Sequence, residues 1–137
     1  MYEVVVIVWK RRIFMQEKVI VAVDAMGGDN APAEIVKGVV DAVSQSENVI
    51  VKLVGQENVV SEELKKYTYR ESAIEIVNAT EVIETGEPPV MAIRRKKDSS
   101  IVVGLNLVKK GEADAFVSAG SSGAILVGGQ LIGGRIK

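Results

Sequence analysis

The hydrophobic positions of this chain fall into two alternating patterns. Short continuous apolar runs, typical of strands buried on both faces, lie at 19–23, 49–54, 73–77 and 115–118. Apolar residues at helical spacing lie in the segments 32–45, 57–67, 90–96, 101–109 and from 124 onward. Because strands alternate with helices, the pattern predicts βαβ units and an α/β fold with a mostly parallel sheet.

The two ends of the chain depart from this pattern. The apolar run 4–8 is far too short to span a bilayer, and positive charges follow it instead of preceding it as in a signal peptide. We interpret 1–14 as an extension or upstream start outside the fold and 15–137 as one domain; an added edge strand is the alternative. Residues 124–132 are apolar on nearly every side, which predicts a buried helix that a partner or a further part of the protein covers.

Composition limits the chemistry that is available. The 137 residues are 47% hydrophobic and 26% charged, which suits a folded domain, and the formal net charge of −1 argues against a nucleic-acid-binding protein. The sequence has no cysteine and no histidine, which excludes disulfides, thiolate or histidine metal sites, and cysteine or Ser-His-Asp catalysis. Any reaction must use carboxylates, lysines, arginines, hydroxyls or backbone donors.

A glycine-containing loop, DAMGGDNAP at 24–32, joins the strand 19–23 to the following helix. In this layout the backbone N–H groups of a loop and a helix N-terminus can face the same small anion. Gly27 and Gly28 allow the backbone to approach a ligand closely. The loop matches neither the Rossmann fingerprint nor the Walker A pattern.

Two acids in this loop oppose anion binding unless they have a structural role or bind a cation. Pro32 stands where a first helical residue is expected, and Asp29 or Asn30 precedes it as a candidate cap, with Asp29 favoured. Asp24, at the end of the strand, is expected to organise the loop.

A second loop, Ser118-Ala-Gly-Ser-Ser-Gly123, offers hydroxyls and unhindered backbone donors before the last helix. Because parallel strands end at the same edge of a sheet, both loops emerge where α/β folds bind ligands. A phosphate site and a glycine turn with a serine N-cap explain this loop equally well. The candidate phosphate-site residues are Asp24, Gly27, Gly28, Asp29, Ser118, Gly120, Ser121, Ser122 and Gly123.

The densest run of positive charge is Arg94-Arg95-Lys96-Lys97. Such runs are usually solvated, and the functional alternative is docking of a phosphate or an acidic partner. Asp98-Ser99-Ser100 is expected to cap the helix that follows. Glu81, Glu84 and Glu87 form an acidic stretch without the pattern of a calcium site, and we assign no metal to it.

Three segments together carry a resemblance that none carries alone. They are DAMGGDNAP at 24–32, P-x-x-A-x-R-x-K-K-D-S-S at 89–100 and ADAFVSAGSSGA at 113–124. Over roughly 18–137 the chain resembles the phosphate acyltransferases of bacterial phospholipid synthesis, the PlsX family. The resemblance implies a Rossmann-like three-layer α/β/α sandwich, of which this chain is an incomplete copy because family members are more than twice as long.

The resemblance also implies an activity. A fatty acyl group would pass from acyl carrier protein to inorganic phosphate, giving acyl phosphate for phospholipid synthesis. No cofactor and no nucleic acid are implied, and the protein would be a cytoplasmic homodimer whose missing half makes any peripheral contact with the inner face of the membrane. We hypothesise that the glycine loops hold phosphate and that Arg94, Arg95, Lys96 and Lys97 dock the carrier.

The chain departs from the family pattern in one motif and in length. Ser121-Ser122 stands where Asn-Thr is common, which keeps small polar side chains. The missing half should supply part of the active site and the dimer interface. Two other hypotheses remain, a phosphate- or nucleotide-binding module without chemistry and an inactive truncated fragment.

Overall fold

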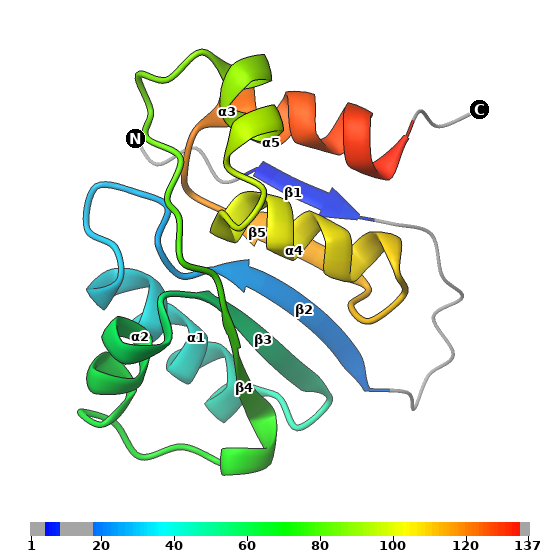
Figure 1. Ribbon diagram of the computed structural model, residues 1–137. Helices are drawn as coiled ribbons and strands as arrows, with labels where there is room; N and C mark the ends of the chain where they lie inside the picture. The colour runs from blue at the N-terminus through cyan, green and yellow to red at the C-terminus, as the bar shows by residue number, and fades with distance from the viewer. Residues whose placement is uncertain (1–4, 9–17, 135–137) are drawn as a thin grey trace.

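A five-stranded sheet forms the central layer of the protein (Figure 1). The structure, a computed structural model, describes residues 5–8 and 18–134. The strands are β1 (Val5–Val8), β2 (Val19–Asp24), β3 (Val49–Gly55), β4 (Ile74–Asn78) and β5 (Ala115–Ser118). Their order across the sheet is β1-β5-β2-β3-β4; β1 pairs antiparallel with β5, and the other pairings are parallel. The predicted α/β fold with a mostly parallel sheet is confirmed.

Helices cover both faces of this sheet and complete a Rossmann-like three-layer sandwich (Figure 1). They are α1 (Ala33–Gln45), α2 (Glu57–Leu64), α3 (Pro89–Arg95), α4 (Ser100–Lys109) and α5 (Ser122–Gly128), with a 3₁₀ turn, η1 (Glu71–Ala73), and a π-helical turn, η2 (Gly129–Gly133). α1 and α2 pack on one face; α4 packs on the other, and α3 and α5 contribute to the same hydrophobic core.

Each face of the sheet buries its own hydrophobic core. Leu53 points into the core beneath α1 and α2, whereas its neighbour Val54 points into the core beneath α4, because successive strand residues face opposite sides. Phe116, fully buried, lies in the second core against Gly104 of α4, where a Cβ would overlap its ring. Burying one such aliphatic or aromatic side chain contributes about 1.5–3 kcal/mol, so these two cores supply most of the favourable free energy of folding.

The N-terminal apolar run forms an edge strand of the sheet. β1 lies on the outer edge of β5, with Val5 opposite Ser118 and Val8 opposite Ala115, which is the edge-strand alternative. Residues 1–4 and 9–14 lie outside the described residues, so the division into an extension (1–14) and a domain (15–137) stays a prediction.

The last helical segment is only partly buried within this chain. Ala124 and Ile125 are fully buried in α5, but the exposed fractions of Leu126 and Leu131 are 63% and 55%. Exposure of these two leucines in the single chain agrees with an apolar helix that a partner or a further part of the protein covers, and that covering stays a prediction. Within the described ranges, no helix combines the length and the apolar character required to cross a bilayer.

Candidate functional site

Asp24 lies at the carboxyl end of β2 with only 1% of its surface exposed. Its Oδ1 accepts hydrogen bonds from the backbone N–H groups of Met26 and Gly27, both at 3.0 Å. Its Oδ2 accepts the hydroxyl of Ser118 at 2.7 Å, across 94 positions of sequence. A carboxylate is tolerated in the interior when hydrogen bonds satisfy its oxygens, as they do here. These bonds confirm that Asp24 organises the loop.

The same carboxylate holds the two glycine loops against each other. Ser118 Oγ, besides donating to Asp24, accepts the N–H of Gly120 at 3.0 Å, so the two loops share one hydrogen-bonded network. The backbones also touch directly, since a Cβ added to Gly27 would lie 2.9 Å from both Cα and N of Gly120. Adjacent parallel strands, β2 and β5, thus bring together the two loops that the sequence placed at one sheet edge.

The paired loops leave backbone donors free at this edge. Among the hydrogen bonds of the described residues, none is donated by the N–H groups of Gly28, Asp29, Asn30, Ser122 or Gly123. A pocket of about 220 Å³ opens beside the first loop and is lined by Gly28, Asp29, Asn30, Ala31, Glu34, Ile35 and Ala119. Free N–H groups suit an anion or a developing oxyanion, whereas the two carboxylates of the lining oppose a multiply charged one.

The helix caps differ between the two loops. Ser121 is the N-cap of α5, and its hydroxyl accepts the N–H of Ala124 at 3.2 Å, which is the serine-cap alternative for the second loop. The cap predicted for the first loop is wrong. α1 has Pro32 at its N-cap position, makes no side-chain cap hydrogen bond, and leaves Asp29 exposed in the preceding turn.

The basic run does not present all four of its cations in the same way. Arg94, Arg95 and Lys97 are exposed and form no ion pair among the described residues. Lys96 turns back onto the protein, where its ammonium donates to the carbonyl of Val82 at 2.7 Å and to Glu87 Oε1 at 2.5 Å. The side chain of Lys96 therefore holds the loop 82–87 in place.

Ion pairing and hydrogen bonding lower the pKa values of two carboxyl groups in this region, those of Glu87 and Asp98. The Lys96 ammonium lowers the pKa of the Glu87 carboxyl, and the backbone N–H of Glu84 lowers it further. The hydroxyl and the N–H of Thr80 donate to Asp98 Oδ2 and lower the pKa of that carboxyl. Both groups therefore stay ionised to lower pH than free carboxylates.

Glu81 and Ser99 fix the other end of the same segment. The carboxylate of Glu81 accepts the N–H of Asp98 at 3.0 Å, and its carbonyl accepts the N–H of Ser100 at 3.2 Å. Ser99 is the N-cap of α4, as predicted, and accepts the N–H of Val102 at 3.3 Å. Sequence reasoning found the cap from its serine but missed the roles of Glu81 and Lys96, whose side chains have partners 9–17 positions away.

Comparison with known proteins identifies the family of this chain. Residues 19–137 match the model of a family described as "Fatty acid synthesis protein". The chain belongs to this family. The match contains both glycine loops, the basic run and the 79–99 segment, whereas β1 precedes it.

Curated relatives named "Phosphate acyltransferase" match the same part of the chain. That of Clostridium acetobutylicum is 53% identical over 118 residues, which cover 86% of this chain and 36% of the relative. Those of Clostridium botulinum and Clostridium kluyveri are 54% identical over 117 residues and 53% identical over 119, covering 85% and 86% of this chain and 35% of each relative. The chain spans about a third of the length of these relatives, and the resemblance inferred from the three motifs is confirmed.

Proposed function

We propose that this chain supplies substrate-binding loops of a phosphate acyltransferase, which transfers a fatty acyl group from acyl carrier protein to inorganic phosphate. Family membership and the names of the relatives support this activity. The observation that carries it is the pair of glycine loops joined through Asp24 and Ser118, with free backbone donors at the carboxyl edge of the sheet. The acyl phosphate would serve phospholipid synthesis, in a homodimer whose further part contacts the membrane.

The reaction suits a site that offers backbone donors. One phosphate oxygen attacks the thioester carbonyl carbon; a C–O bond forms, the C–S bond breaks, and the carrier sulfur leaves as a thiolate that takes a proton from solvent. Phosphate is already partly dianionic near neutral pH, so positioning it matters more than a strong base. The N–H groups of 28–30 and 122–123 would hold the phosphate and the developing oxyanion.

A chimera tests this proposal. The matching segment of the Clostridium acetobutylicum relative is replaced by residues 19–137 of this chain, and the chimera is incubated with acyl carrier protein thioester and phosphate. We expect acyl phosphate and free carrier thiol in equal amounts, with the unaltered relative as control. Thiol release without acyl phosphate, or no turnover by a folded chimera, contradicts the proposal.

The exposed cations of the basic run are proposed to dock the acidic carrier. The structure sharpens the test, because Lys96 is engaged internally and should be left intact. In the chimera, Arg95→Glu with Lys97→Glu should weaken carrier binding about tenfold or more, since opposed charges become like charges at the interface. Lys109→Glu with Lys110→Glu, the same charge change at the far end of α4, is the matched control. Equal effects of the two double variants would reject the docking site.

A binding module without chemistry is the second candidate, favoured by the small share of the relatives that this chain spans. Phosphate should then raise the thermal stability of the chain alone, by about 2.7 kcal/mol at a hundredfold excess over Kd. A chain that folds and ignores phosphate would exclude this candidate.

A further inference from the structure

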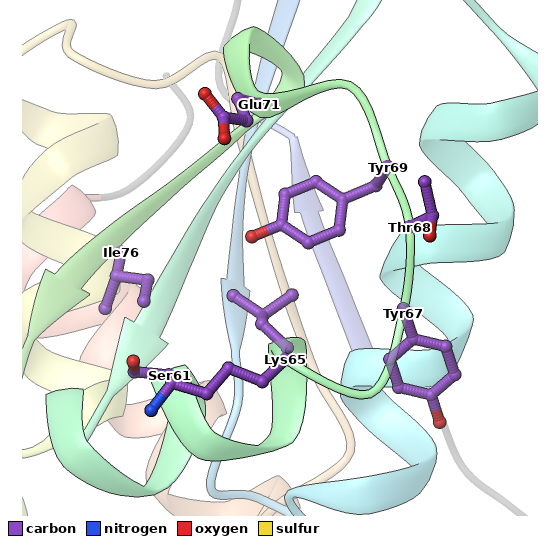
Figure 2. A pocket seen from close by; sticks show the side chains of 8 residues that line it. Ser61, Lys65, Tyr67, Thr68, Tyr69, Glu71 and Ile76 are labelled. Carbon is purple, nitrogen blue, oxygen red and sulfur yellow. The ribbon is translucent and has the colours of Figure 1, made fainter.

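A second pocket, of about 350 Å³, lies away from the glycine loops (Figure 2). It is lined by Ser61, Leu64, Lys65, Tyr67, Thr68, Tyr69, Glu71 and Ile76. These residues come from the end of α2, the connection that follows it, η1 and β4, whereas the glycine loops follow β2 and β5. The pocket therefore belongs to a different part of the protein from the site described above.

The floor and the rim of this pocket differ in chemistry. Leu64, which is 3% exposed, and Ile76 provide an apolar floor. Around it stand the hydroxyls of Ser61, Thr68 and Tyr69, and none of the side-chain hydrogen bonds of the described residues uses them. A ligand must therefore offer hydrogen-bonding groups as well as an apolar surface, which disfavours a plain acyl chain.

Two opposite charges stand on different sides of the hollow. Figure 2 shows Lys65 running along α2 toward Ser61, and Glu71 on the far side of the Tyr69 ring. The Lys65 ammonium pairs with Glu62, but these side chains are 66% and 72% exposed. Such an exposed pair contributes little, so a bound anion can replace Glu62 as the partner of Lys65.

Tyr69 supplies a flat apolar surface between the two charges. Its ring lies across the hollow in Figure 2, whereas the ring of Tyr67 lies to the side. Aromatic rings stack on tyrosine with an offset, and heterocyclic bases do so without regard to their identity. The ring, the cation and the carboxylate together define a ligand with three distinct parts.

We propose that this pocket binds a small ligand with an amino-bearing flat ring at one end and an anionic group at the other, of the size of one nucleoside monophosphate. The ring stacks on Tyr69 and its amino group donates to Glu71. The anion meets Lys65 and the hydroxyl of Ser61, which lie beside each other in Figure 2. The volume lies at the lower end of the range for small-molecule pockets, which excludes a dinucleotide.

Titration of the ¹⁵N-labelled chain with AMP tests this site directly. We expect chemical-shift changes at 61–76 and a Kd of about 1 mM or tighter. Adenosine, which lacks the anion, and IMP, which lacks the amino group, should each bind at least fivefold more weakly. Lys65→Gln should weaken AMP binding to a similar extent.

Lys66→Gln is the matched control, because Lys66 pairs with Glu63 and does not line the pocket. Equal effects of the two lysine variants, or equal binding of AMP and adenosine, overturn the proposal. Shifts at 28–31 and 121–123 in place of 61–76 overturn it too, and they would place phosphate binding at the glycine loops. The outcome is independent of acyl transfer, so either proposal can fail without the other.

Discussion

Two polar networks of this protein have similar bond lengths and very different surroundings. Ser118 donates to Asp24 at 2.7 Å with both residues 1% exposed, whereas Lys96 donates to Glu87 at 2.5 Å with side chains 31% and 29% exposed. Distance alone would rank the second bond higher. Burial reverses that ranking, because a polar group that loses its partner in the interior cannot turn to water.

The networks also differ in what they connect. The buried network joins two strand ends that are 94 positions apart and fixes the geometry of the candidate site. The exposed bonds of Glu87 and Asp98 hold one surface segment to itself and to the start of α4. Substitutions in the buried network should therefore change both the stability of the protein and the geometry of the candidate site. Substitutions of the exposed residues should change neither strongly.

Asp24→Ala should have the largest effect. It leaves the Ser118 hydroxyl and the N–H groups of Met26 and Gly27 without an acceptor, which should cost about 3 kcal/mol in the free energy of unfolding. Urea denaturation measures the change. Asp29→Ala, a few residues away and exposed, should remain within about 0.5 kcal/mol. Similar losses of unfolding free energy for Asp24→Ala and Asp29→Ala would contradict the difference expected between the buried and the exposed carboxylate.

Gly27→Ala comes next. The new methyl group would meet Asp24 and the backbone of Gly120, so the loops must separate, at about 1–3 kcal/mol. The control is Gly38→Ala in α1, where no atom lies within 4 Å of the new Cβ. That variant should gain about 0.5–1 kcal/mol, since alanine favours a helix over glycine. Thermal denaturation of both variants measures these changes in stability. A Gly27→Ala variant as stable as the wild-type protein would refute the close contact between Gly27 and Gly120.

Two neighbouring serines allow a finer comparison. Ser121→Ala removes the N-cap bond of α5 and should cost about 1 kcal/mol. Ser122→Ala, at the next and exposed position, should stay within about 0.5 kcal/mol. Chemical denaturation distinguishes them, and a larger loss at Ser122 would show that the capping role has been assigned to the wrong residue.

The smallest effect is expected from the exposed carboxylates. Their folded-state pKa values lie below the ordinary 4.5 of Glu87 and 3.8 of Asp98, so their stabilisation is present above those values and is lost as pH falls through the folded pKa values. Glu87→Gln with Asp98→Asn should flatten the acid limb of the stability curve slightly, and added salt should weaken the Lys96–Glu87 contribution in the wild-type protein. An acid limb unchanged by the double variant would argue against these bonds in solution.

The sequence predicted the elements well because their signals are local. The strand at 115–118 has its predicted bounds, and Ser99 caps α4 because a serine before an apolar helical pattern is a local signal. The same reasoning failed at Asp29, where a turn between Gly28 and Pro32 places the helix start beyond the reach of its carboxylate.

The features that could not be predicted from the sequence depend on contacts between residues far apart in the chain. The two loops could be placed at one sheet edge, but no pattern at Asp24 or Ser118 shows that they bond to each other. Lys96 looks like its three basic neighbours until the fold places Val82 and Glu87 beside it. The pocket at Tyr69 likewise exists only because a connection after α2 folds over β4.

The central place of β2 has a consequence for how the protein folds. β2 meets β3 after one helix, but it meets β5 only when the chain closes across the 94 positions between Asp24 and Ser118. Closing a longer loop costs more chain entropy, so we expect local pairing of β2, β3 and β4 to precede the arrival of β5. The loops of the candidate site should then assemble late in folding, and a local opening that frees β5 should disassemble them while half of the sheet stays intact.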